Sequence, residues 1–465
     1  MEKDTIQKLE GIVGSTNLLV TEEDRACYAY DGTFQFHMPD VVVKPRNKEQ
    51  VAQILKLACS TSTPVYPRGA GTGLSGGALP VKGGIAMVLS DMNKIIDIDK
   101  ENLVAVVEPG VVTARLQAEV EQLGLFYPPD PASCEVSTIG GNIAECAGGP
   151  RCFKYGVTRD YVLGLEVVTP TGEIINTGGK TIKNVTGYDL TRLIVGSEGT
   201  LGVVTRAILR LVPRPKSVRT ALVAFDDLYK ASEAVLYLSE LGVVPATMEI
   251  LDEETIKCVE KFIDYSLPFN ARAVLLIEVD GRPLAVEEEM KMVREACLAK
   301  GAQRVEVAST AEERNKLWNL RRSVSPALVK IAPTKISEDA TVPRARVPEM
   351  ITRLQKIKEK YNINLVIFGH IGDGNLHPNI MTDERNSEEM TRVEKAINEI
   401  FQTALELGGT LSGEHGIGNM KSPFMEMEMG NDGLAYMYKI KKSLDPKGIL
   451  NPGKLFIGDQ FNGKT

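Results

Sequence analysis

Three of the four histidines of the chain lie within 46 residues and are the first candidates for chemistry. His370 and His377 bracket the segment GHIGDGNLH, and His415 follows Glu414 in GEHGIG. Two imidazoles and a carboxylate suit zinc, iron or manganese and leave coordination positions open for a substrate. Three unrelated histidines with hydrogen-bonding roles are the alternative. Because glycines flank both motifs, we expect exposed loops at strand ends. His37 lies apart and is expected to be structural or exposed.

A second group of residues could bind an anion. Arg321 and Arg322 lie in WNLRRSVSPAL, and Lys335 lies at the start of a predicted strand in APTKISEDATVP. Arginine suits carboxylate binding because its planar guanidinium donates two parallel hydrogen bonds. Arginine and lysine are usually solvated, which is the alternative for each of these residues.

Three glycine-rich loops precede these motifs. The first, YPRGAGTGLSGGALP at 66–80, fits G-x-G-x-x-G, and Asp97 follows at the distance that a Rossmann site requires. A Rossmann turn must open into a helix, whereas Pro80, Gly83 and Gly84 interrupt one here. The loops at 137–149 and 195–205 share the pattern. Each could be a tight turn, but together they favour backbone binding of a phosphate.

The elements that must position these motifs fall into two blocks. Residues 41–215 alternate short strands, such as 41–43 and 63–66, with helices that carry Val51 to Ala58 and Leu116 to Leu123. Glycine is sparse from 216 to 365, where a strand at 273–279 and a helix at 283–300 are predicted. Two prolines in VPRPKS at 212–217 mark the boundary. The turn-rich segment 444–456 is expected to pack back on the first block.

Bulk composition narrows the class of protein. The chain has 465 residues and a net charge of −7, and no window is rich in basic residues without acids, so nucleic-acid binding is not expected. There is neither a signal peptide nor an apolar run of about 18 residues, so no membrane span is expected. Seven scattered cysteines without a C-x-x-C pair disfavour an iron–sulfur cluster or zinc ribbon and indicate a reducing, cytoplasmic location.

The glycine-rich segments PRGAGTG, PPDPASCEVSTIGGN with AGGPRCFKYG, and GYDLTRLIVGSEGTLG resemble the FAD-binding domain of the vanillyl-alcohol oxidase (PCMH)-type flavoenzymes. The resemblance is closest to the branch of FAD-dependent D-2-hydroxy-acid dehydrogenases that holds the glycolate oxidase D-subunit and D-lactate dehydrogenase. It implies an α+β fold with a PCMH-type FAD-binding domain at 1–215, an α+β cap domain with an antiparallel sheet and the metal site at 216–420, and a C-terminal segment at 421–465 that packs on the FAD domain.

The resemblance also assigns roles to residues. The first loop has no histidine, so we expect non-covalent FAD. The implied flavin contacts are Arg68, Gly69, Ala70, Gly71, Thr72, Gly73, Ser75, Pro129, Ser133, Thr138, Gly140, Gly141, Asn142, Ala147, Glu198 and Gly199. The implied ligands of one divalent metal are His370, His377 and Glu414, and the implied catalytic base is His415. The implied substrate contacts are Arg321, Ser325, Lys335 and Asn379.

The predicted reaction is oxidation of a small D-2-hydroxy acid, with hydride passing from C2 to flavin N5. D-Lactate is the first choice, with glycolate and D-2-hydroxyglutarate as alternatives. The chain carries no second redox centre that its sequence reveals, so the electrons should pass to a partner: an electron-transfer flavoprotein, as in electron-bifurcating lactate dehydrogenase complexes, or an iron–sulfur subunit. A nicotinamide dehydrogenase, a metallohydrolase and a non-catalytic electron-transfer flavoprotein each leave one group of motifs unexplained.

Overall fold

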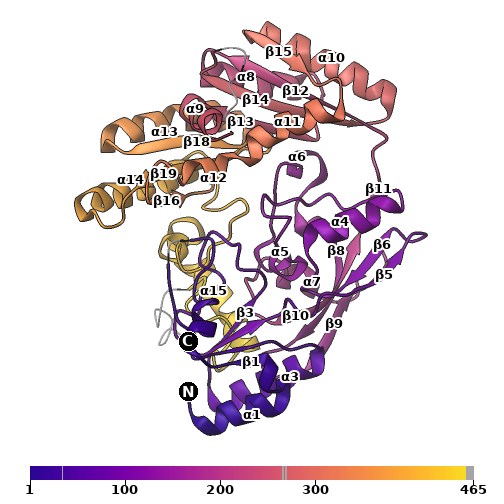
Figure 1. The fold of residues 1–465 in the computed structure, drawn as a ribbon, viewed down its shortest axis with the longest axis vertical. Coiled ribbons are helices and arrows are strands. Elements are labelled where there is room, and N and C mark those ends of the chain that lie inside the picture. The colour runs from indigo at the N-terminus through magenta and orange to yellow at the C-terminus, as the bar shows by residue number, and fades with distance from the viewer. Residues whose placement is uncertain (34, 264–266, 268–269, 457–465) are drawn as a thin grey trace. The chain divides into compact units, whose positions relative to one another are not determined.

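The computed structural model describes residues 1–33, 35–263, 267 and 270–456. They form two units, which are drawn in Figure 1. Unit 1 comprises residues 1–148, 157–214 and 414–456, and unit 2 comprises 149–156 and 215–413. The divisions predicted at 215/216 and 420/421 fall near two of the four peptide bonds at which the chain changes unit. The sequence did not indicate that residues 149–156 belong to unit 2.

Two sheets build most of unit 1. The smaller sheet has the order β1 (Leu18–Leu19), β2 (Val41–Val43), β4 (Ile85–Val88) and β3 (Val65–Arg68), and its last three strands are parallel. The antiparallel five-stranded sheet has the order β5 (Ile95–Asp99), β6 (Val104–Val107), β10 (Val203–Arg210), β8 (Val162–Val168) and β9 (Ile174–Gly178). Strand β7 (Leu125–Phe126) pairs with β11 (Val212–Pro213). The helices are α1 (Lys3–Val13), α2 (Glu22–Ala26), α3 (Lys48–Thr61), α4 (Thr113–Gln122), α5 (Ile139–Glu145), α7 (Leu190–Ile194) and α15 (Met425–Leu444).

Local sequence explains the first part of unit 1. Helix α3 begins where the Asn47 side chain accepts a hydrogen bond from the Gln50 amide, and it buries one apolar face against the smaller sheet. The predicted strand at 63–66 lies two residues further along, as β3. Strand β4, rather than a helix, follows the first glycine loop, in agreement with the rejection of a Rossmann unit. Leu123 was expected within the helix that carries Leu116, but it follows α4 and is exposed.

Unit 2 is one antiparallel eight-stranded sheet with helices on both faces. Its strands are β15 (Arg304–Val307), β12 (Ser217–Phe225), β14 (Ala273–Gly281), β13 (Thr247–Asp252), β18 (Asn364–His370), β19 (Asn375–Thr382) and β16 (Thr334–Ser337), in spatial order, and β17 (Ala340–Thr341) also pairs with β19. The short helix α6 (Cys152–Tyr155) belongs to this unit.

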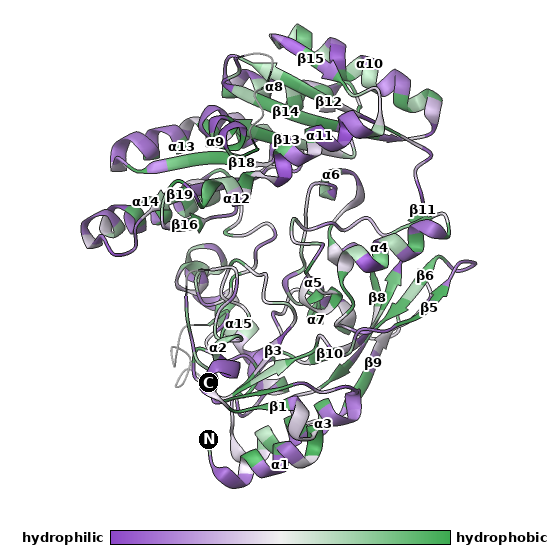
Figure 2. Ribbon diagram, viewed as in Figure 1, coloured by the Kyte–Doolittle hydropathy of each residue, from purple (hydrophilic) through white to green (hydrophobic). Residues whose placement is uncertain are grey.

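The two faces of this sheet have separate hydrophobic cores. One face packs against α8 (Leu228–Glu240), α10 (Pro283–Ala299), α13 (Val347–Tyr361) and α14 (Ser387–Glu406). The other packs against α9 (Glu253–Ile263), α11 (Ala311–Arg322) and α12 (Val324–Leu328). Figure 2 shows apolar strands, whereas much of α10 and α13 is hydrophilic, as expected for helices with one solvated face.

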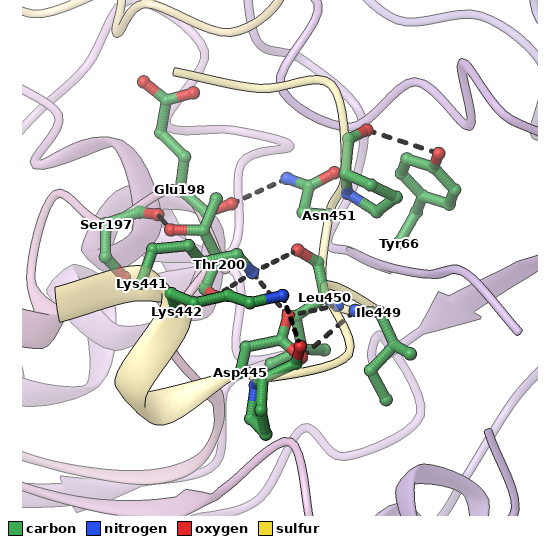
Figure 3. Close-up of polar contacts among 12 residues, drawn as sticks. Tyr66, Ser197, Glu198, Thr200, Lys441, Lys442, Asp445, Ile449, Leu450 and Asn451 are labelled. Carbon is green, nitrogen blue, oxygen red and sulfur yellow. Dashed lines mark hydrogen bonds and ion pairs between the residues drawn. The ribbon is translucent and has the colours of Figure 1, made fainter. Parts of the chain in front are cut away.

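The described C-terminal residues pack against the glycine loops of unit 1. The Lys441 ammonium donates to the carbonyl oxygens of Thr200, at 2.7 Å, and Leu450, at 2.8 Å. Asn451 donates to the carbonyl oxygen of Glu198 at 2.6 Å. These contacts, drawn in Figure 3, tie the end of the chain to the loop that begins at Gly196. Among the described residues, no helix combines the length and apolarity that a membrane span needs.

Candidate active site

A cavity in unit 1 is lined mainly by the three glycine-rich loops. Fourteen of the sixteen predicted flavin contacts line it, and the two exceptions are Ser75 and Pro129. Ser75 is fully buried, and the Pro129 carbonyl accepts a hydrogen bond from Gln117 at 2.9 Å. The sequence therefore identified the wall of the cavity, while these two residues lie behind it.

Glycine is required where the backbone must come close to a neighbour. A methyl group added at Gly140 would lie 2.6 Å from the Pro109 Cβ and 3.0 Å from its carbonyl oxygen. At Gly71, where φ is +72°, it would lie 2.1 Å from Arg68 Nη2. At these two positions the cavity wall is bare backbone, which lets a large planar or phosphorylated ligand approach the amide groups there.

Arg68 gives the cavity a cation suited to phosphate. Its side chain is buried and lines the cavity, and its Nη1 has no hydrogen-bond partner among the described residues. Burial lowers the pKa of the Arg68 guanidinium from its ordinary value, although nearby Asp31 opposes this change. A buried guanidinium with an unused donor fits a phosphate group such as the pyrophosphate of FAD.

An acidic pair lies beside the cavity and was not predicted as a pair. Glu145 and Glu198 both line the cavity. Glu198 accepts hydrogen bonds from the Ile417 and Gly418 amides, each at 2.7 Å. Burial raises the pKa of Glu145 well above its ordinary value, and the negative charge of the neighbouring Glu198 raises it further. Burial lowers the pKa of nearby Lys454 to about 8.

In unit 2, His370 and His377 lie on one face of the sheet. His370 ends β18 and His377 is the third residue of β19, where it pairs with Phe368. Their ring centroids are 5.0 Å apart, and His377 Nδ1 lies 4.0 Å from Asp339 Oδ1. Both rings are buried, so the expected exposed loops are wrong. The glycines that suggested loops lie within β18 and in the connecting turn.

A buried carboxylate that the sequence analysis missed holds two of the predicted residues. Glu249 Oε1 lies 2.6 Å from His370 Nδ1, and its Oε2 accepts from Arg321 Nε, also at 2.6 Å. Burial alone would raise the pKa of Glu249, but His370 and Arg321 together hold it below its ordinary value. Because Glu249 engages the Nδ1 side of His370, the Nε2 atom faces away, as in histidines that bind metals.

Lys335 and Ser325, two of the predicted substrate contacts, are joined by a hydrogen bond. Lys335 Nζ donates to Ser325 Oγ at 2.7 Å, and burial lowers the pKa of this lysine. Asn379 is fully buried on β19 and donates to the His377 carbonyl at 2.9 Å. Arg322 is exposed over the Trp318 ring, which agrees with a solvated neighbour rather than an anchor.

Glu414 and His415 belong to unit 1 and line its cavity. They follow Gly413, the last residue of unit 2, which packs so tightly that a methyl group there would lie 2.2 Å from Thr341 Oγ1. Of the three predicted metal ligands, His370 and His377 therefore belong to unit 2. Glu414 is the first residue of unit 1 after the chain leaves unit 2. The binding of a metal by this set stays a prediction.

Comparison with known proteins places these features in a family. Residues 214–455 match the model for the C-terminal domain of FAD-linked oxidases, and residues 39–178 match an FAD-binding domain. The chain belongs to the FAD-linked oxidases. The chain is thus an FAD-linked oxidoreductase, and the predicted family and α+β, PCMH-type fold class are confirmed.

Several relatives span nearly the same length. Glycolate oxidase subunit GlcD of Bacillus subtilis is 48% identical, over 98% of this chain and 97% of its own. GlcD of Escherichia coli strain K12 is 37% identical, over 95% and 89%. D-Lactate dehydrogenase of Anaerostipes hadrus is 35% identical, over 90% and 89%. The structure of p-cresol methylhydroxylase has a TM-score of 0.82 at 19% identity, over 98% of this chain and 96% of its own, which supports the fold alone.

Proposed function

We propose that this FAD-linked oxidoreductase oxidises a small 2-hydroxy monocarboxylic acid to the corresponding 2-oxo acid. Lys335 carries the proposal. Its side chain is half-buried, and among the described residues its ammonium donates to the Ser325 hydroxyl while no carboxylate forms an ion pair with it. A partly desolvated cation without an anionic partner is unfavourable, in agreement with the lowered pKa of this lysine. A substrate carboxylate would provide the missing charge.

The roles of the other residues follow from their chemistry. Arg321, oriented by Glu249, and Asn379 are proposed to fix the substrate beside Lys335. His415 is proposed to accept the proton of the C2 hydroxyl, because histidine is the side chain that most often acts as a general base. FAD, held non-covalently by the glycine loops and Arg68, would supply the two-electron acceptor.

A divalent metal is proposed for His370, His377 and Glu414. The buried Glu249 orients the His370 ring, and the second imidazole lies on the same face of the sheet. This donor set suits zinc, iron or manganese. Such an ion would lower the pKa of a bound hydroxyl. Asp339, 4.0 Å from His377 Nδ1, is an additional carboxylate that could orient the second ring.

The choice of substrate lies between glycolate and D-lactate. D-Lactate is the sequence-based expectation, whereas the two glycolate oxidase subunits named above have higher identity to this chain than the D-lactate dehydrogenase has. One methyl group is worth only about 1–3 kcal/mol in a pocket, so each acid must be tested. We propose glycolate as the first to try.

A protein partner is proposed to take the electrons from the reduced flavin. Relatives are named as subunits, which supports an assembly. An iron–sulfur subunit and an electron-transfer flavoprotein remain the two candidates, because the sequence of this chain carries no cysteine motif for a cluster of its own.

The test is anaerobic reduction of the purified holoprotein, followed by its visible spectrum. Glycolate or D-lactate should bleach the oxidised flavin, and L-lactate should not. Lys335→Met should retain the flavin but require at least about tenfold more substrate, because it loses a charged hydrogen bond. The exposed Lys330→Met is the matched control and should behave as the wild type. A flavin that no 2-hydroxy acid reduces would overturn the proposal.

A further inference from the structure

Residues 149–156 form a strap that leaves unit 1 and returns to it. The residues on either side, Gly148 and Val157, belong to unit 1, whereas the strap belongs to unit 2. Its base is closed in unit 1, where Thr158 Oγ1 donates to the Ala147 carbonyl at 2.7 Å. Ala147 and Gly148 both line the cavity of the glycine loops. The strap therefore begins at the cavity wall.

The tip of the strap is clamped to the sheet of unit 2 by Asp280. The Lys154 ammonium lies 2.6 Å from Asp280 Oδ1, and the Tyr155 hydroxyl donates to its Oδ2 at 2.7 Å. Asp280 is buried at the end of β14. Both carboxylate oxygens are thus used by adjacent residues of helix α6, which is labelled in Figure 1. A buried, doubly bonded carboxylate gives a fixed attachment.

Phe153 directs the strap to the turn that joins the two histidines. A methyl group added at Gly372 would lie 3.2 Å from the Phe153 ring, so the ring already touches the turn backbone. Arg344 covers the ring, its guanidinium carbon 5.0 Å from the centroid. The same ring packs against the larger hydrophobic core of unit 2. The same methyl group at Gly372 would lie 2.9 Å from Met248 Cε, so Phe153 and Met248 together support the turn, and Ile371 is buried in the same core.

We propose that Phe153 and the Asp280 clamp are positioning elements, which couple the cavity wall at Ala147 and Gly148 to the turn between His370 and His377. This inference rests on the proposed function. The coupling is mechanical: one continuous segment begins at the cavity wall, is tied back to it by the hydrogen bond from Thr158 to the Ala147 carbonyl, and has its aromatic side chain packed against the turn. Small displacements of catalytic groups are costly, up to about a hundredfold in rate for 1 Å.

The kinetic test compares Phe153→Ala with Phe153→Leu in the full-length holoprotein. Under anaerobic rapid mixing, Phe153→Ala should reduce its flavin about tenfold to a hundredfold more slowly at saturating substrate, with the substrate concentration at half-maximal rate changed less than about threefold. Phe153→Leu should restore most of the rate because it refills the contact. Tyr237→Ala truncates an aromatic ring packed on the same core and should leave the rate unchanged. Equal losses in both alanine variants would overturn the proposal.

Hydrogen exchange separates failure of this inference from failure of the proposed function. Asp280→Asn, measured without any substrate, should speed amide exchange both in 371–374 and at 147–148. Faster exchange confined to 149–156 would show an attachment that transmits nothing, and would overturn the coupling. If no hydroxy acid reduces the flavin of the wild type, the proposed function fails. The exchange result still decides whether the strap couples residues 147–148 to residues 371–374.

Discussion

The cavity of unit 1 differs in construction from the face of the unit 2 sheet that carries His370 and His377, which we call the histidine face. Glycines form much of the cavity wall, and at 71 and 140 the neighbouring Arg68 and Pro109 leave no room for a side chain. The histidine face consists of side chains on β13, β18, β19 and β16, held by ion pairs through Glu249. One region excludes side chains to admit a large ligand, and the other uses rigid strands to orient charged groups.

This difference teaches where each region is fragile. A wall of backbone fails when atoms are added, since the protein interior is close-packed and cannot yield locally. A face of paired charges fails when one partner loses its charge, since the remaining partner stays buried and unpaired. Substitutions chosen for each failure should therefore separate FAD binding from hydroxy-acid chemistry.

The largest effect is expected from adding a methyl group to the cavity wall. Gly140→Ala places a carbon 2.6 Å from the Pro109 Cβ, with the Pro109 carbonyl oxygen 3.0 Å away, so backbone must move. We expect loss of bound FAD, measured as the ratio of flavin to protein absorbance, and hence loss of activity. Gly11→Ala in α1, where nothing lies within 4 Å, is the control and should keep full flavin content. Normal flavin content in Gly140→Ala would show that the wall yields.

Neutralising Glu249 should leave FAD binding intact but slow the reaction. Glu249→Gln keeps the shape but removes the charge that pairs with His370 and Arg321. We expect FAD content to stay normal while the rate of flavin reduction falls by about 10–100-fold, the usual cost of losing a group that orients a metal ligand. Metal content, measured by elemental analysis, should fall as well. Loss of FAD in this variant would contradict the separation of the two regions.

The sequence revealed the cavity better than the histidine face for a physical reason. Glycine requirements are local, so loops at 66–80, 137–149 and 195–205 are visible as motifs. Even there, Ser75 and Pro129 lie behind the wall, because spacing cannot distinguish a side chain that lines a cavity from one that supports it. Glu145 was missed because its environment depends on Glu198, which is distant in sequence.

The histidine face was mistaken for loops because its strands break the usual patterns. Pro378 lies inside β19 and Gly369 inside β18, although both residues normally interrupt strands. Glu249 had a detectable signal, since it is an acid flanked by apolar residues in the segment MEIL. Its partners His370 and Arg321 lie more than 70 residues away, so only the folded sheet shows what the carboxylate holds.

A third variant tests how much the proposed binding of substrate by Lys335 depends on the hydrogen bond between Lys335 and Ser325. Ser325→Ala removes the acceptor for Lys335 Nζ but leaves the ammonium in place. We expect KM to rise by a few fold to about tenfold, with kcat nearly unchanged, because a single hydrogen bond contributes about 0.5–1.5 kcal/mol. Ser239→Ala on α8 is the control. A fall in kcat at constant KM would assign Ser325 to the reaction step rather than to binding.

The smallest effect on chemistry is expected for Glu278, which lies on the same face of the sheet as His370 and holds the helix that carries Arg321. This buried carboxylate accepts hydrogen bonds from Arg314 at 2.8 Å, from the Trp318 indole at 2.8 Å and from Thr220 at 2.6 Å, and so holds α11, the helix that ends with Arg321 and Arg322. Glu278→Gln should lower the free energy of unfolding by about 1–3 kcal/mol while flavin reduction at 25 °C changes little. Trp318, the only tryptophan, provides a local fluorescence probe of this loss.

The pH dependence of the stability difference between wild type and Glu278→Gln tests whether the charge of Glu278 causes it. Burial would raise the pKa of Glu278, but Arg314 and the hydrogen bonds outweigh burial and hold it below the ordinary value of 4.5. The unfolded chain therefore binds the proton more readily than the folded one, and the stabilisation is complete above about pH 5 and is lost as the pH falls through the folded-state pKa. The stability difference between wild type and Glu278→Gln should accordingly be constant from pH 6 to 8 and shrink below about pH 4.5. Glu312→Gln, an exposed change on the same helix, should show no such trend. A difference that persists in acid would mean that packing, rather than charge, anchors α11, and the histidine face would then resemble the cavity wall more than its ion pairs indicate.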